Sequence, residues 1–196
     1  PNPSKLGWVS HIGEVLKKDV VNHGICGASN KEILWNFIKH SELITPEDSV
    51  VIQWSYFERN CLIRSHRNAL RPNIDSVGVI KLAPWSTDKI CKVYYKFLHS
   101  EIDDVYSTAL YVNHANLLLN HYGIKKALMI KPPGNKSTTA MMRKELDELI
   151  LPGVTISEKN LMVFKVDIAL DGVHPGVKSN QGLAGNIIEN YQHILK

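Results

Sequence analysis

An uninterrupted apolar segment in the middle of the chain restricts most strongly what this sequence can fold into. Residues 48–54 read Asp-Ser-Val-Val-Ile-Gln-Trp, and adjacent apolar side chains of this kind are typical of a strand buried on both faces. A similar run covers residues 127–130. Apolar residues recur at helical spacing over 31–40 and 94–122. Because strands that alternate with helices form parallel sheets with right-handed crossovers, we expect an α/β fold.

The remaining segments extend the same pattern. Each shows helical apolar spacing or a short apolar run, and we expect helices over 8–16, 141–150 and 182–195 and strands over 19–24 and 162–168. Residues 59–87 are expected to be irregular, because two prolines and Gly78 interrupt them. Ser29 or Asn30 is expected to cap the helix that follows, and Gly123 to end the long helix before it.

Composition sets the size of the core and argues against several classes of protein. With 196 residues, of which 44% are hydrophobic, the chain is long enough for one core, and we expect a single domain over 1–196. A net charge of +4, scattered along the chain, does not favour nucleic-acid binding. No apolar run approaches the ~18 residues of a membrane span. We therefore expect a soluble protein without a membrane span.

The cysteines and histidines give no metal-binding pattern. Cys26, Cys61 and Cys91 are odd in number and lack CxxC spacing, so buried free thiols in a reducing compartment are expected instead of a disulfide framework or a zinc site. The histidines show no i,i+4 pairing with carboxylates, and no metal or cofactor is proposed. His23 is expected to be a packed or hydrogen-bonded residue without a catalytic role.

Residues 171–176, Asp-Gly-Val-His-Pro-Gly, carry the strongest functional signal. An Asp three residues before a His on a turn lets the carboxylate orient the imidazole, while the second ring nitrogen can take a proton from a nucleophile. The pair would follow the strand expected at 162–168, where open α/β sheets place their chemistry. The alternative is an ordinary turn, because Asp, Gly and Pro also favour turns for conformational reasons.

Residues 20–30, Val-Val-Asn-His-Gly-Ile-Cys-Gly-Ala-Ser-Asn, and the pair Asp171 and His174 together resemble the SGNH (GDSL-like) hydrolase family, in particular its small members from tailed bacteriophages. The first segment is similar to the second sequence block, whose Gly donates a backbone N–H to the oxyanion hole, and this Gly is Gly27. The pair is similar to the fifth block, which supplies the acid and the base. The resemblance implies a three-layer α/β/α sandwich with a parallel sheet, the flavodoxin-like SGNH fold.

The third block departs from the family pattern. The family ends its strand in Gly-x-Asn-Asp, whereas this chain has Trp-Ser-Tyr-Phe-Glu-Arg-Asn over 54–60. Ser55 and Phe57 therefore stand where the Gly and the oxyanion-binding Asn belong. The second oxyanion donor would have to be Asn60, Arg59 or a backbone N–H near Ser55. Loss of one such donor typically costs about 2.7–4 kcal/mol of transition-state stabilisation.

The first block, which carries the nucleophilic serine, has no counterpart in the sequence. Ser4 is the only serine before Trp8, and no apolar strand precedes it. The resemblance implies that a natural N-terminal segment of about 10–25 residues, upstream of Pro1, carries the central strand and the serine. The alternative is a chain that has lost catalysis, although its sheet would then lack a central strand and expose two strand edges.

The resemblance implies a serine esterase that acts on O-acetyl or other small ester groups of a carbohydrate or lipid through a Ser-His-Asp mechanism. The alternative is a non-catalytic phage virion or accessory protein on the same scaffold. A phage-encoded protein would be expected in the host cytoplasm or the virion, as a homo-oligomer or part of a virion assembly. Four aromatic residues would line a sugar-binding groove or belong to the core or a subunit contact: Trp85, Tyr94, Tyr95 and Phe97.

Overall fold

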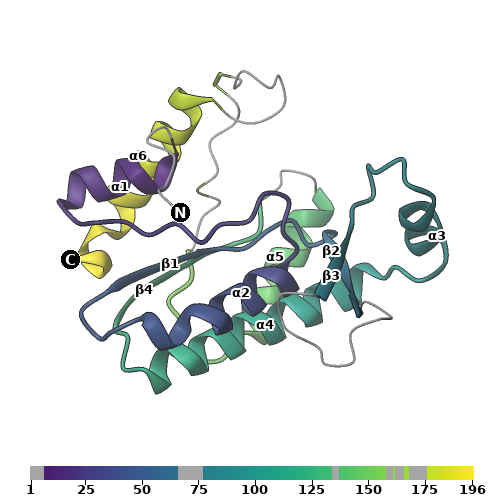
Figure 1. The fold of residues 1–196 in the computed structure, drawn as a ribbon, viewed down its shortest axis with the longest axis horizontal. Helices are drawn as coiled ribbons and strands as arrows, with labels where there is room; N and C mark the ends of the chain where they lie inside the picture. Colours follow the sequence, from purple (N-terminus) through teal and green to yellow (C-terminus); the bar gives the residue numbers. More distant parts are fainter. Residues whose placement is uncertain (1–6, 66–76, 134–136, 158–160, 162–165, 168–175) are drawn as a thin grey trace.

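The computed structural model describes residues 7–65, 77–133, 137–157, 161, 166–167 and 176–196, and over these residues the chain is a mixed α/β protein (Figure 1). The helices and strands follow one another as α1 (Trp8–Leu16), α2 (Asn30–His40), the short 3-10 helix η1 (Ser41–Leu43), β1 (Ser49–Gln53), β2 (Asn60–Ser65), β3 (Val77–Leu82), α3 (Lys89–Phe97), α4 (Glu101–His121), β4 (Lys126–Ile130), α5 (Ser137–Leu149) and α6 (Val177–Leu195).

The two apolar runs pair as a parallel sheet, as predicted. Strands β1 and β4 are in register from Ser49 opposite Lys126 to Gln53 opposite Ile130. The backbone N–H of Trp54 donates to the Ile130 carbonyl at 3.1 Å, which extends the pairing past the end of β1. On the other side of β4, Met129 forms a parallel bridge with Ile156. The carboxyl ends of both strands therefore lie at one edge of the sheet.

Helices pack on both faces of this sheet. One face presents Leu128 and Ile130 to α1 and α6, and the opposite face presents Ile52 and Met129 to α2 and α4 (Figure 1). Alternation of side chains along a strand produces these two faces. Full burial of one such side chain contributes about 1.5–3 kcal/mol, so the two clusters are the main source of stability here.

The strand predicted over 19–24 is wrong. Residues 18–25 lie between α1 and the turn before α2 and belong to no strand. Val21 is 67% exposed, and the Asn22 side chain accepts a hydrogen bond from the Gly24 N–H at 2.8 Å. A local turn of this kind satisfies the backbone without a neighbouring strand.

The prediction that residues 59–87 are irregular is also wrong for two stretches, 60–65 and 77–82, which are strands. Strands β2 and β3 form an antiparallel two-stranded ribbon, with Asn60 opposite Leu82 and Ser65 opposite Val77. This ribbon is a separate sheet from the parallel pair. Residues 66–76 lie outside the described part of the chain.

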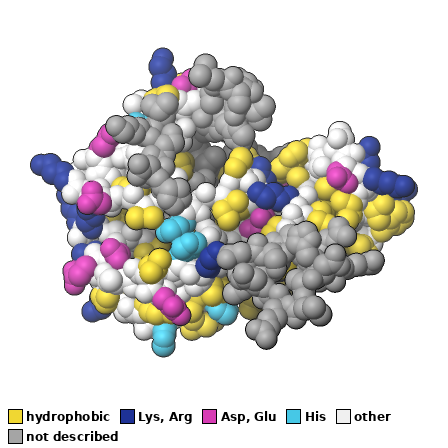
Figure 2. All heavy atoms as spheres, viewed as in Figure 1, with side chains coloured by type: hydrophobic (Ala, Val, Ile, Leu, Met, Phe, Trp, Pro, Cys, Tyr) yellow, Lys and Arg dark blue, Asp and Glu magenta, His cyan; other side chains and the backbone are white. Residues whose placement is uncertain are grey.

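The long helix predicted over 94–122 is two helices. α3 ends at Phe97, and α4 begins after Ser100, whose hydroxyl accepts a hydrogen bond from the Asp103 N–H at 3.4 Å. Gly123, at φ 71°, follows the end of α4, as the sequence predicts. Large hydrophobic side chains are exposed on α3 and the start of α4, and hydrophobic side chains gather at the right-hand side of Figure 2. On these helices and the turn between them the exposed residues are Ile90, Val93, Phe97, Leu98 and Ile102.

The cysteines are free, but they are not all buried. Cys61 and Cys91 are buried, whereas Cys26 is exposed. The prediction of three buried thiols is therefore wrong for Cys26, because this residue lies on the turn before α2 and outside the core. No helix among the described residues is long and apolar enough to cross a membrane.

Candidate functional site at the carboxyl end of the parallel sheet

Three of the five predicted site residues lie in the described part of the chain. Gly27 lies on the turn before α2, Ser55 follows the end of β1, and Asn60 is the first residue of β2. Asp171 and His174 lie outside the described residues, as does most of the strand predicted over 162–168. The described residues that flank this gap show that Asp167 accepts hydrogen bonds from the backbone N–H groups at the start of α6.

Gly27 has a backbone conformation that suits a glycine. Its φ of 67° is left-handed, and the turn is closed by the Ala28 N–H, which donates to the Ile25 carbonyl at 3.2 Å. No described residue accepts a hydrogen bond from the Gly27 N–H. Lys81 donates to the Cys26 carbonyl, and its Nζ lies 3.8 Å from the position of a Cβ on Gly27. Positive charge therefore lies beside this turn.

A capping box fixes the start of α2. The Ser29 N–H donates to the Glu32 carboxylate at 2.9 Å, and the Glu32 N–H donates to the Ser29 hydroxyl at 3.3 Å. Of the two residues predicted to cap this helix, Ser29 is therefore the cap. The arrangement satisfies two backbone donors at the helix N-terminus and sets the direction in which the preceding turn enters the helix.

Asn30 connects the start of α2 to the end of β1. Its Oδ1 accepts a hydrogen bond from the Ser55 N–H at 2.7 Å, and its Nδ2 donates to the Thr108 hydroxyl on α4 at 3.0 Å. Asn30 and Thr108 are both buried. Buried amides of this kind are costly to leave unpaired, so the contact fixes the turn of Gly27 near the carboxyl end of β1.

The segment after β1 presents a guanidinium beside two aromatic rings that pack edge to face on each other. The Arg59 Nη1 donates to the Ser55 hydroxyl at 3.3 Å. The Arg59 guanidinium carbon lies 5.1 Å from the centre of the Tyr56 ring and 5.2 Å from that of Trp85. Both distances are within the range of cation–π attraction. Apart from Ser55, no described residue accepts a hydrogen bond from the Arg59 guanidinium, whose other N–H groups suit a ligand with hydroxyl or carbonyl oxygens.

Asn60 belongs to a partly buried polar cluster around the buried Asp104 at the base of the ribbon. Its Nδ2 donates to Asp104 Oδ1 at 2.8 Å, and His99 Nε2 lies 2.7 Å from Asp104 Oδ2. Burial raises the pKa of the Asp104 carboxyl, although the hydrogen bonds from Asn60 and His99 act to lower it. The Tyr95 hydroxyl donates to the Glu58 carbonyl beside this cluster.

The pair formed by His99 and Asp104 is not predicted by the sequence pattern. The signal was present as a His directly before a Ser cap and an acidic first turn, but it lay inside the segment predicted as one helix. The pair has the geometry in which a carboxylate orients an imidazole. No serine, threonine or cysteine among the described residues hydrogen-bonds to the His99 ring. Asp104, in the first turn of α4, is the residue that joins Asn60 of β2 and His99 to this helix.

The predicted aromatic cluster is divided between two places. Tyr94 and Tyr95 pack edge to face with ring centres 5.0 Å apart, close to His99, whereas Trp85 packs on Tyr56. Phe97 is 68% exposed. The four residues therefore do not line one groove. His23 packs on the ring of His40 at 3.9 Å, in agreement with the packed role predicted for it. Burial, followed by the nearby His40, lowers the pKa of His23.

Across the described residues, no group of three or more His, Cys, Asp and Glu side chains is placed to hold a metal ion. No known family model, curated protein or solved structure matches the chain.

Proposed function

We propose that the chain is an SGNH-type serine ester hydrolase built as a three-layer α/β/α sandwich. The observation that carries this proposal is the bond from the Ser55 N–H to Asn30 Oδ1, which holds the second and third sequence blocks together at the carboxyl end of β1. Ligands of open α/β sheets bind at this edge. Helices packed on both faces of the parallel pair support the sandwich.

The proposed mechanism uses a serine that precedes α1 in the chain. His174 takes the proton of the serine hydroxyl, the serine oxygen forms a bond to the ester carbonyl carbon, and Asp171 orients the imidazole. Collapse of the tetrahedral intermediate breaks the bond to the alcohol oxygen, which receives the proton from His174. Water then attacks the acyl-enzyme by the same route and releases the acid.

Gly27 is the proposed donor to the oxyanion. The backbone N–H of Ser55 is used by Asn30, and the Asn60 amide donates to Asp104, so each has a partner already. Gly27 has no such partner among the described residues, and the Lys81 ammonium lies beside it. A positive charge near the developing oxyanion stabilises it in a site shielded from water.

The proposed substrate is an O-acetyl or other small ester of a carbohydrate or lipid. The support in the structure is Arg59 beside the rings of Tyr56 and Trp85, close to Ser55, because a planar guanidinium next to aromatic rings suits the hydroxyls and apolar face of a sugar. In line with the phage-like resemblance, we place the protein in the host cytoplasm or the virion.

The test is fluorophosphonate labelling of the natural full-length protein, with the labelled peptide located by mass spectrometry. We expect one labelled serine that precedes α1, and loss of labelling in His174→Ala. The matched control is His121→Ala, which removes an exposed histidine at the end of α4 and should leave labelling unchanged. No labelling of folded protein would contradict the proposal.

A non-catalytic binding or assembly role on the same scaffold is the second candidate. It is favoured by the large apolar side chains exposed over α3 and the start of α4, because contiguous exposed apolar surface marks interaction sites. This candidate predicts no labelling, no effect of His174→Ala beyond local packing, and self-association or capture into a virion. Sedimentation of the unlabelled protein distinguishes it from an inactive monomer.

A further inference from the structure

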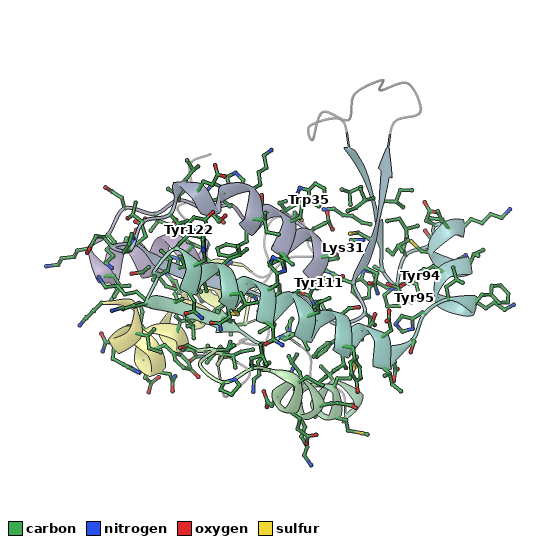
Figure 3. All side chains as sticks on the ribbon, turned by 90° about the horizontal axis from the view of Figure 1, so that it is seen from below. Lys31, Trp35, Tyr94, Tyr95, Tyr111 and Tyr122 are labelled. Atoms are coloured by element: carbon green, nitrogen blue, oxygen red, sulfur yellow. The ribbon has the colours of Figure 1, made fainter. Side chains whose placement is uncertain are left out.

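A groove lies between α2 and the ribbon of β2 and β3, and none of its polar groups has a role in the mechanism above. Its volume is about 190 Å³. Figure 3 shows Lys31 and Trp35 of α2 on the side that faces the ribbon. The groove is lined by residues of the turn before α2, of α2 and of both strands: Ile25, Lys31, Glu32, Trp35, Asn36, Lys39, Cys61, Ile63 and Val79.

Regular spacing brings these residues to one place. Glu32, Trp35 and Lys39 recur at helical intervals on one side of α2. Ile63 and Val79 are direct partners in the ribbon and therefore share one of its faces. Trp35 is 42% exposed, Ile63 39% and Val79 42%, although all three line the same groove. Large apolar side chains that remain half-exposed around a common hollow indicate a ligand with apolar surface.

The charged residues of the groove favour an anion. Lys31 lies in the first turn of α2 and Lys39 in the last, so the α2 side of the groove carries two ammonium groups. The Glu32 carboxylate accepts from the Ser29 N–H and hydroxyl, at 2.9 and 3.2 Å, and is thereby directed into the helix cap. The N-terminus of α2 adds partial positive charge at the Lys31 end.

We propose that this groove binds a monocarboxylate with an unbranched apolar chain. The chain lies along Trp35, Ile63 and Val79, and the carboxylate lies at Lys31. A volume of about 190 Å³ holds several water molecules and therefore leaves room for a short apolar chain. The inference goes beyond ester hydrolysis and does not depend on it.

The test is titration of the full-length protein with octanoate, in which binding is measured by isothermal titration calorimetry and by tryptophan fluorescence. Acetate supplies the head group without the chain, and octylamine supplies the chain with the opposite charge. Octanoate should bind at least about tenfold more tightly than either, a difference of about 1.4 kcal/mol. Trp35→Phe should remove the fluorescence change and retain most of the calorimetric signal.

Two neighbouring residues of β2 give a matched pair of variants. Ile63 lines the groove, whereas Leu62 is exposed to a similar degree, 41% against 39%, and lies on the opposite face of the ribbon. Ile63→Glu should weaken octanoate binding by about tenfold or more, because it places a carboxylate beside the chain. Leu62→Glu should change binding by less than about twofold and controls for damage to the ribbon.

The head group is tested in the same way. Lys31→Glu should weaken octanoate binding by about tenfold, and Lys144→Glu, an equal change of charge on α5, should not. The proposal is overturned if octylamine or acetate binds as well as octanoate, or if Ile63→Glu and Leu62→Glu behave alike. Octanoate binding without fluorophosphonate labelling would reject the esterase and keep the groove, and the reverse result would reject the groove alone.

Discussion

The two sheets of this protein are built from similar residues but lie in different surroundings. β1 and β4 are covered by helices on both faces, and Ile52, Leu128, Met129 and Ile130 are buried. The ribbon of β2 and β3 leaves apolar side chains half-exposed on both of its faces. A two-stranded ribbon is marginal by itself, so it must gain its stability at its base.

The difference separates the parts of the molecule that stabilise it from the parts that are free to bind. The clusters around the parallel sheet account for most of the large buried side chains. The ribbon and α3 carry part of the apolar surface that faces solvent, including Leu62, Ile63 and Val79 of the ribbon and Val93 and Phe97 of α3. Substitutions in the first region should therefore lower stability, and conservative substitutions in the second should mainly affect binding.

The largest expected effect comes from matched isoleucines in the two sheets. Ile52→Ala on β1 should lower the free energy of unfolding by about 2–5 kcal/mol, because it leaves a cavity in a closed core. Ile63→Ala on β2 should cost about 1 kcal/mol, since much of this side chain is exposed already. Urea denaturation monitored by circular dichroism measures both. Equal losses would show that the ribbon is packed as tightly as the parallel sheet.

The base of the ribbon should respond next most strongly. Asp104→Ala removes the partner of Asn60 Nδ2 and His99 Nε2, which should cost about 1–3 kcal/mol through the unpaired donors. Exposed Asp103, one residue earlier on α4, offers the control, and Asp103→Ala should change the free energy of unfolding by less than about 0.5 kcal/mol. A similar result for both variants would mean that the cluster does not anchor β2.

The same carboxyl makes stability depend on pH in a defined direction. Because burial raises the pKa of Asp104, the folded protein binds its proton more readily than the unfolded chain does. Asp104 therefore contributes to the free energy of unfolding below the usual carboxyl pKa of about 4. This contribution is lost as the pH rises through the pKa of Asp104 in the folded protein. Wild type should therefore lose stability relative to Asp104→Asn as the pH is raised from about 4. Urea denaturation of both proteins at a series of pH values measures the difference between their free energies of unfolding. A difference that stays constant with pH would contradict the prediction.

The parallel sheet was predictable because burial on both faces leaves a clear signal. The run Val50, Val51 and Ile52 has no polar interruption, and β1 and β4 were found with nearly correct bounds. The ribbon was missed because its apolar residues do not alternate. Leu62 and Ile63 are adjacent and half-exposed on opposite faces, and Gly78 interrupts β3. A strand without a single buried face has no period to detect.

The candidate site was predictable only in its local parts. Gly27 as a turn glycine and Ser29 as a cap follow from neighbouring residues and helix chemistry. The contact of Asn30 with Ser55 spans 25 positions, and that of Asn60 with Asp104 spans 44. No sequence periodicity encodes such pairs. They exist because crossovers bring the ends of separate elements to the same edge of the sheet.

The helix caps of the two regions should also differ in how much they contribute to stability. Ser29 is buried in a capping box beside the parallel sheet, whereas Asp88 caps α3 at an exposed position through a 2.8 Å bond from the Ile90 N–H. Ser29→Ala should cost about 2 kcal/mol and Asp88→Ala about 0.5 kcal/mol, the two ends of the usual range for such caps. Water can replace Asp88 but cannot reach the Ser29 N–H and the Glu32 carboxylate as readily. Thermal unfolding of both variants checks this, and a larger loss for Asp88→Ala would reverse the assignment of stability to the parallel sheet.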